Sequence, residues 1–163
     1  GMKVLVYDPF CLKSNKKINF VSLDFLLKHS RFVSLSASSN NNNKYLISKK
    51  ELKKMSKNSY LINTARGNLV DTNALLTTLK NNEIAGAAID VLETSEKYDR
   101  SINQGWKHSE NFSKTPLRKL KNVILTPHMA GYTKKTITKQ SNEIIRNINL
   151  LFNNKIPKSI LNK

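Results

Sequence analysis

Short apolar runs alternate with helix-patterned segments along most of this 163-residue chain, and this alternation restricts its fold more than any other feature. Strand-like runs occupy residues 3–7, 31–37, 59–65, 84–91 and 122–128. Helical patterns occupy residues 22–29, 48–55, 71–81 and 133–152, and the first three begin at the capping residues Ser22, Ser48 and Asp71. Strands that alternate with helices form a parallel sheet with helices on both faces. The sequence therefore predicts an α/β fold with a doubly wound parallel sheet.

Length and composition limit the chain to one cored domain or to part of a larger one. Its 163 residues are 39% hydrophobic, which suffices for one core but not comfortably for two. No stretch has the length and apolarity of a membrane span, and the N-terminal residues lack the layout of a signal peptide. Cys11 is the only cysteine, so an internal disulfide is excluded. We expect a cytoplasmic protein with no membrane partner.

The strong positive charge points to acidic partners without specifying nucleic acid. The formal net charge is +17, and the lysines occur together with many asparagines, as in the run SSNNNNK at 38–44. A single-strand-binding surface would gather its basic residues into one patch with aromatic residues between them. Here the basic residues are spread over every segment. We therefore expect no nucleic-acid partner, but a general attraction for small acidic substrates remains.

Polar and charged side chains stand where the predicted strands end. Ligands of parallel α/β sheets bind at the carboxyl ends of the strands. We therefore expect these side chains to line one crevice. The residues concerned are Asp8, Ser36, Asn63 to Arg66, Asp90 and Thr126 to His128.

Each charged residue of this group also has an ordinary structural explanation when it is taken alone. Arg66 is then a surface residue, His128 a hydrogen-bonded histidine, Asp90 a loop cap and Asp8 the first residue of a turn. The other histidines show no metal-ligand spacing, so we expect no metal site.

Four segments give these residues a family context. They are YDP at 7–9, INTARGNLVD at 62–71, IAGAAIDV at 84–91 and NVILTPHMAGYT at 122–133. In this order and at these distances they resemble the NAD-binding domain of the D-isomer-specific 2-hydroxyacid dehydrogenases. The resemblance covers nearly the whole chain apart from a loop near residues 93–114. It implies a Rossmann-like fold, NAD as cofactor, and hydride transfer between a small 2-hydroxy acid and its 2-keto acid.

The resemblance also implies roles for individual residues. Arg66 would hold the substrate carboxylate, because a guanidinium binds carboxylate with two parallel hydrogen bonds and stays charged. His128 would be the acid/base, because imidazole titrates near neutral pH. Asp8 would bind the adenosine ribose hydroxyls, which favours NAD over NADP. The remaining residues implied in cofactor binding are Thr64, Ala65, Asp90 and Gly131.

One departure from the family pattern concerns the carboxylate that pairs with the histidine. In the family it lies five residues after the aspartate, and in this chain that position is Ser95. Glu96 stands one residue later. Either the loop shifts so that Glu96 reaches His128, or the pair is missing and activity is weakened or lost.

The second departure concerns the start of the domain. The glycine-rich turn that would bind the pyrophosphate, with its preceding strand and following helix, would come before GMKVLVYDP and is not in the sequence. The missing strand is central in this fold, so its absence would leave two open strand edges. We expect a truncated piece of a dehydrogenase, with an incomplete Rossmann domain at 1–152, a long polar loop at 93–121, and a tail at 153–163 that resembles the return to the substrate domain.

Two functions remain open at this stage. The first is an NAD-dependent oxidoreductase acting on a 2-hydroxy acid, which the retained Arg66 and His128 favour. The second is a corepressor-like binding or assembly protein, or an inactive relic, on the same half-domain; Ser95 and the missing phosphate turn favour it. We expect a homodimer in either case.

Overall fold

The computed structural model describes residues 1–11, 19–40, 42–93 and 112–157. The chain divides into two compact units, Gly1–His128 and Met129–Lys163. The first unit contains both β-sheets and the short helices, and the second contains one long helix.

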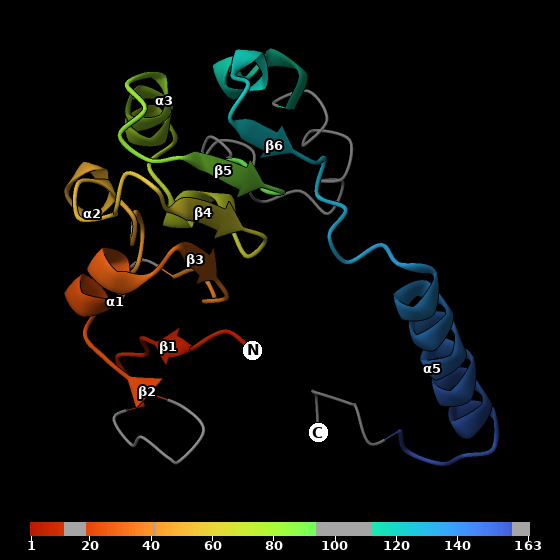
Figure 1. Ribbon diagram of the computed structural model, residues 1–163. Helices are drawn as coiled ribbons and strands as arrows, with labels where there is room; N and C mark the ends of the chain where they lie inside the picture. The colour runs from red at the N-terminus through yellow and green to blue at the C-terminus, as the bar shows by residue number, and fades with distance from the viewer. Residues whose placement is uncertain (12–18, 41, 94–111, 158–163) are drawn as a thin grey trace. The chain divides into compact units, whose positions relative to one another are not determined.

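The first unit is built on a four-stranded parallel sheet (Figure 1). Its strands run in the order β3-β4-β5-β6, with the bounds β3 Phe32–Leu35, β4 Tyr60–Asn63, β5 Gly86–Ile89 and β6 Val123–Leu125. The last residues of the four strands are in register, namely Leu35, Asn63, Ile89 and Leu125. All four strands therefore end at one side of the sheet, which we call the carboxyl edge. The predicted parallel α/β sheet is confirmed.

A separate two-stranded parallel sheet precedes it. β1 (Leu5–Val6) pairs with β2 (Asn19–Phe20), a strand that the sequence did not predict. Among the described residues, β1 has only β2 as a neighbour and β3 has only β4. One edge of β1 and one edge of β3 thus have no strand partner in the described part of the chain, and this arrangement fits a partial Rossmann-like domain.

Three helices begin at the caps that the sequence indicated. They are α1 (Leu23–His29), α2 (Lys49–Leu52) and α3 (Thr72–Lys80). Ser22 and Asp71 accept backbone N–H groups of the first turn, and Ser48 forms a capping box with Glu51. These contacts satisfy N–H groups that a helix start leaves without an intrahelical partner.

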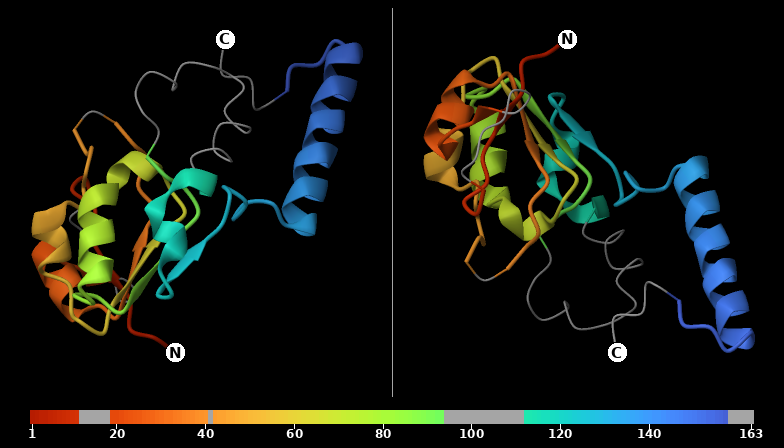
Figure 2. Two further views of the ribbon diagram at one scale, coloured as in Figure 1. Left: turned by 90° about the horizontal axis from the view of Figure 1, so that it is seen from above. Right: turned by 90° about the horizontal axis from the view of Figure 1, so that it is seen from below.

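The helices of the first unit lie on one face of the four-stranded sheet (Figure 2). The strand residues on that face are buried with them, and the core includes Leu27, Leu61, Leu75, Leu79 and Leu117. On the opposite face Phe32, Tyr60 and Ile124 are 50%, 37% and 67% exposed. The expectation of helices on both faces is therefore met on one face only within this unit, because α1, α2 and α3 all return on the same side.

Two 3-10 helices complete the first unit, η1 (Gly67–Leu69) and η3 (Pro116–Lys119). The second unit consists mainly of α5 (Lys134–Phe152), which Thr133 caps through its side chain.

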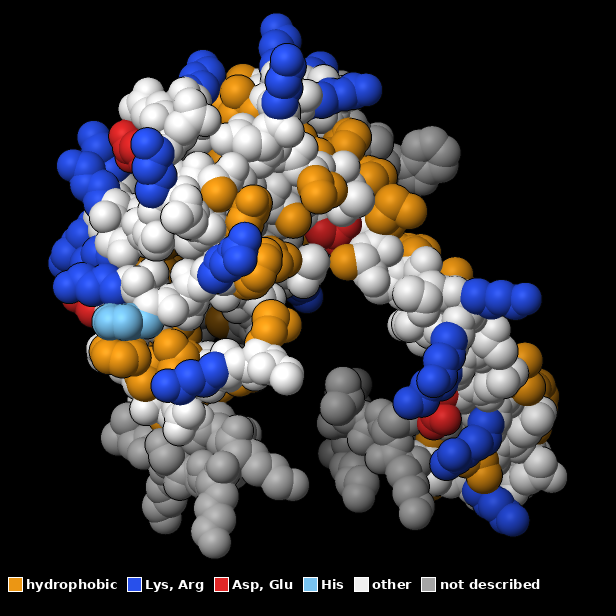
Figure 3. All heavy atoms as spheres, in the orientation of Figure 1, with side chains coloured by type: hydrophobic (Ala, Val, Ile, Leu, Met, Phe, Trp, Pro, Cys, Tyr) orange, Lys and Arg blue, Asp and Glu red, His pale blue; other side chains and the backbone are white. Residues whose placement is uncertain are grey.

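Among the described residues, no helix has the length and apolarity needed to cross a membrane. On the face shown in Figure 3, Lys and Arg side chains lie over several elements and do not form one stripe.

Candidate functional site

The carboxyl edge collects most of the predicted site residues. Arg66 follows β4, Asp90 directly follows β5, and His128 follows β6. Because β5 lies between β4 and β6 and adjacent strands are roughly 4.8 Å apart, the ends of β4 and β6 are about 10 Å apart. A guanidinium, a carboxylate and an imidazole thus follow three neighbouring strand ends.

The turn that carries Arg66 is fixed by a buried asparagine. The Asn63 side chain is buried; its Nδ2 donates to the carbonyl of Arg66 at 2.9 Å, and its Oδ1 accepts from the backbone N–H of Ala65 at 3.1 Å. The Arg66 side chain is exposed, with Nη1 donating to the carbonyl of Ala65 at 2.7 Å. The backbone is therefore held in place while the guanidinium faces outward.

Gly67 allows this turn to pack against the residues that follow β5. A Cβ at Gly67 would lie 2.0 Å from the carbonyl oxygen of Leu92, although the φ angle of Gly67 is not positive. Glycine is thus required here for close backbone approach rather than for a left-handed conformation.

Tyr45 adds a second contact between the same segments. Its backbone N–H donates to the carbonyl of Asn68 at 2.8 Å, and its hydroxyl donates to the carboxylate of Glu93. The hydrogen bond to Glu93 raises the pKa of Tyr45, with burial acting in the same direction. The turn after β4 is thereby linked to the segment after β5.

His128 occupies a backbone conformation that is uncommon for a side-chain-bearing residue. Its φ angle is 53°, in the left-handed region. Its backbone N–H donates to the carbonyl oxygens of Asp90 at 2.9 Å and of Thr126 at 3.0 Å. Backbone strain of this kind concentrates at functional sites, where the surrounding structure holds it.

Asp90 lies between the two other charged residues and is 5% exposed. Its Oδ1 accepts a hydrogen bond of 2.5 Å from the hydroxyl of Thr126, and its backbone N–H donates to the carbonyl of Asn63 at 2.9 Å. Asp90 therefore contacts both the Arg66 side and the His128 side of the carboxyl edge.

A hollow of about 430 Å³ opens at the carboxyl edge beside Arg66. Its lining consists of Leu35, Ser36, Ala37, Ser38, Thr64, Ala65 and Arg66. Thr64 and Ala65, both predicted in the cofactor site, thus share a hollow with the predicted carboxylate-binding arginine. Small side chains on its walls leave room for a bound group.

The remaining predicted residues belong to other parts of the chain. Asp8 follows β1 in the two-stranded sheet, and its Oδ1 accepts from the backbone N–H of Phe10 at 2.9 Å, as in a turn. Gly131 belongs to the second unit, where a Cβ would meet no atom within 4 Å. Glu96, Ser95 and most of the predicted loop at 93–121 lie outside the described residues.

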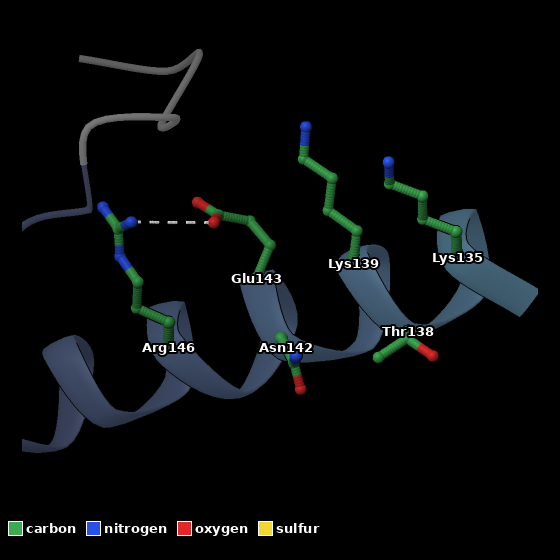
Figure 4. Close-up of a pocket in the computed structure, with 6 residues that line it drawn as sticks. All are labelled: Lys135, Thr138, Lys139, Asn142, Glu143 and Arg146. Carbon is green, nitrogen blue, oxygen red and sulfur yellow. Dashed lines mark ion pairs between the residues drawn. The ribbon is translucent and has the colours of Figure 1, made fainter.

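A second hollow belongs to the second unit, and none of the predicted site residues line it. It follows one side of α5 alone and is lined by Lys135, Thr138, Lys139, Asn142, Glu143 and Arg146 (Figure 4). Arg146 and Glu143 form an ion pair of 3.7 Å on this helix. Because a single helix lines it, the hollow is a polar helix surface.

In the described part of the chain, no group of three or more His, Cys, Asp or Glu residues could hold a metal ion.

Sequence reasoning missed the residues that hold the site in place. Asn63 and Thr126 were noted only as strand-end residues, and Tyr45 and Glu93 were not connected with each other. The available signal for Asn63 was a polar residue that ends an otherwise apolar run and precedes a turn. No local signal pairs Thr126 with Asp90, because the two residues are 36 positions apart.

Known proteins share both the sequence and the fold of this chain. The family model "D-isomer specific 2-hydroxyacid dehydrogenase, NAD binding domain" matches residues 1–130. A D-specific alpha-keto acid dehydrogenase of Enterococcus faecium is 37% identical over 147 residues, which cover 90% of this chain and 44% of that protein. A glyoxylate reductase of Thermococcus litoralis is 34% identical over 166 residues, which cover 100% of this chain and 46% of that protein.

A solved structure shows the same likeness. The D-isomer specific 2-hydroxyacid dehydrogenase of Lactobacillus delbrueckii ssp. bulgaricus in its NAD-complexed form superposes with a TM-score of 0.73 at 32% identity. The match covers 98% of this chain and 48% of that one. The chain thus spans about half the length of the relatives that it resembles.

Proposed function

Because the chain belongs to the D-isomer specific 2-hydroxyacid dehydrogenase family, whose NAD binding domain it matches over residues 1–130, we propose that it is part of an enzyme that interconverts a small 2-hydroxy acid and its 2-keto acid. The observation that carries this proposal is the placement of Arg66, Asp90 and His128 after three neighbouring strands of one parallel sheet. This arrangement offers an anion-binding group and a proton-transfer group at the edge where such sheets bind ligands.

Arg66 binds the substrate carboxylate in this proposal. Its guanidinium is exposed beside the hollow, and its backbone is held by Asn63. A guanidinium makes two parallel hydrogen bonds to a carboxylate, which fix the orientation of the acid as well as its position. The adjacent 2-carbonyl carbon is then presented in one defined direction.

His128 transfers the proton at the 2-oxygen of the substrate. An imidazolium donates a proton to the oxygen as a 2-keto acid is reduced, and a neutral imidazole accepts it in the reverse direction. The side chain of His128 is exposed, while its backbone is bonded to Asp90. Glu96 is proposed as the carboxylate that pairs with the imidazole.

NAD is the cofactor of the family domain and supplies or accepts the hydride when it is bound. The small residues Thr64 and Ala65 would lie against it in the hollow. Asp8 would bind the ribose hydroxyls, and Asp90 and Gly131 would contribute further contacts. The hollow of about 430 Å³ beside Arg66 offers space for part of this cofactor.

The remaining features of the proposal concern substrate class, partners and compartment. The relatives act on several acids, as the names glyoxylate reductase and aromatic 2-oxoacid reductase indicate. We propose a cytoplasmic homodimer without nucleic-acid or membrane partners. The single cysteine supports a reducing compartment, and the scattered basic residues do not favour nucleic-acid binding. The corepressor-like alternative is not favoured, because the named relatives are oxidoreductases.

Titration calorimetry with NADH tests the proposal directly. The chain should bind NADH in the micromolar range at low salt, and ATP should bind more weakly because it lacks the nicotinamide half. Equal heats for NADH, ATP and phosphate would mean that the cations attract any polyanion, and would overturn cofactor binding by this chain.

A second experiment tests the reaction itself. Oxidation of NADH is followed at a fixed concentration of glyoxylate, pyruvate or an aromatic 2-keto acid. His128→Asn should abolish turnover, and His29→Asn should leave it unchanged, because the described contacts of His29 are a hydrogen bond to the carbonyl of Phe25 and stacking on the Phe25 ring, both within α1. Turnover by His128→Asn equal to that of the original chain would remove His128 from the proposed role.

A further inference from the structure

We infer that Asp90 and Thr126 are positioning residues for His128, and that together they clamp the turn after β6 onto the end of β5. The inference deepens the proposed function, because it concerns the residue proposed to transfer the proton. Neither side chain needs to touch the substrate for this role.

The first contact of the clamp joins two side chains. The hydroxyl of Thr126 donates to Oδ1 of Asp90 at 2.5 Å, and Asp90 is 5% exposed. A buried carboxylate requires hydrogen-bond donors, since leaving it without them costs far more than burying a neutral group. The hydroxyl of Thr126 therefore has a strong energetic reason to stay at Asp90.

The second contact joins the two backbones. The carbonyl of Asp90 accepts from the backbone N–H of His128 at 2.9 Å, and the backbone N–H of Thr126 donates to the carbonyl of Ile89 at 3.1 Å. The three residues Thr126, Pro127 and His128 are thus bonded to the end of β5 at both ends of the turn. This pairing extends beyond the last residue of β6, Leu125.

The conformation of His128 explains why a clamp is needed. Its φ angle of 53° is disfavoured for any residue with a Cβ. Such a conformation persists where neighbouring contacts determine it. Pro127 restricts the backbone of Thr126, the residue before it. The hydrogen bonds from the Thr126 hydroxyl and from the His128 N–H to Asp90 restrain the turn at both of its ends.

The family resemblance implies that Asp90 contacts the cofactor, and the clamp gives Asp90 a second role. Its side chain is engaged by Thr126, so the orientation of the carboxylate and the position of the His128 turn are coupled. A change at Thr126 should therefore act on His128 through the backbone of the turn.

Amide hydrogen exchange of the ¹⁵N-labelled full chain tests the clamp. Thr126→Val keeps the shape but removes the hydroxyl, and should speed exchange of the His128 amide by about tenfold or more. Thr126→Ser keeps the hydroxyl and should restore exchange to within about threefold of the original rate. The amide of Leu61 in β4 is the internal reference and should not change in either variant.

Equal His128 exchange in the Val and Ser variants would overturn the clamp. Loss of protection at Leu61 as well would mean that the Val variant has unfolded. Thr126→Cys is then measured in place of the Val variant, because its thiol is a weaker hydrogen-bond donor of similar size. Intermediate exchange at His128 is then expected, and exchange at the original rate would contradict the inference. NADH titration of the same variants separates this result from the proposed function, since exchange is measured without cofactor.

Discussion

The backbone N–H of Asp90 donates a hydrogen bond of 2.9 Å to the carbonyl oxygen of Asn63, and this bond joins the two halves of the candidate site. The side chain of Asn63 holds the turn that carries Arg66, and the side chain of Asp90 bonds the turn that carries His128. The proposed anion-binding and proton-transfer residues are therefore connected through the adjacent ends of β4 and β5.

Replacing Asn63 by Ala should destabilise the first unit by about 2–3 kcal/mol. The change empties a buried side-chain position, removes the acceptor of the Ala65 N–H and the donor to the Arg66 carbonyl, and leaves both backbone groups without these partners in a part-buried turn. Urea denaturation measures the loss. Asn58→Ala is the matched control, since Asn58 is exposed, and should change stability by less than about 0.5 kcal/mol.

Replacing Gly67 by Ala should be among the most damaging single-methyl changes in the chain. The new Cβ would lie 2.0 Å from the Leu92 carbonyl oxygen, and backbone atoms on both sides must then move. We expect a loss of at least about 3 kcal/mol, seen as a lower midpoint in thermal unfolding.

The control for this change is Gly131→Ala. A Cβ there meets no atom within 4 Å and the φ angle is not positive, so stability should hold or rise slightly. Equal midpoints for the two variants would show that η1 does not pack against the segment after β5.

Replacing Ser48 by Ala should remove the capping box of α2 and change the response to acid. Burial of the Glu51 carboxyl tends to raise its pKa, but hydrogen bonds from Ser48 lower it below the ordinary value of 4.5. A carboxyl whose folded pKa is depressed stabilises the fold above its unfolded pKa, and this contribution is lost as pH falls through the folded pKa.

The expected difference between the original chain and Ser48→Ala is about 1 kcal/mol at pH 7. It should shrink as the pH falls below 4.5, because protonation of Glu51 weakens the same hydrogen bonds. Urea denaturation from pH 7 to pH 3 measures this. Ser48→Thr retains the hydroxyl and should follow the original curve, whereas a constant gap across the pH range would contradict the assignment.

Replacing Arg66 by Lys should impair use of the 2-keto acid while sparing the cofactor. Lysine keeps the charge but loses the planar fork, so KM should rise about tenfold, and Arg66→Gln should lower kcat/KM about 100-fold or more. NADH oxidation provides both values. Arg31→Lys is the control, because Arg31 precedes β3 at the opposite end of the strands, and an equal effect there would indicate a general charge effect.

The sequence by itself determined the features whose partners lie within a few residues. The caps at Ser22, Ser48 and Asp71 were predicted because each closes a hydrogen bond within its own first helical turn. The strands β3, β4, β5 and β6 were predicted from runs of apolar residues, and the carboxyl-edge placement of Arg66, Asp90 and His128 followed from parallel topology.

Only the tertiary structure decided how distant segments meet. The pairing of β1 with β2, a strand that the sequence did not predict, depends on which strand edges find a partner, and no local pattern contains that information. The contact of Gly67 with Leu92 and the hydrogen bond between Thr126 and Asp90 likewise join segments that become neighbours only when β4, β5 and β6 pair. Residue types and their order thus identified the candidate chemistry, whereas the backbone conformation of His128 and the anchoring of Arg66 arose from packing across strands.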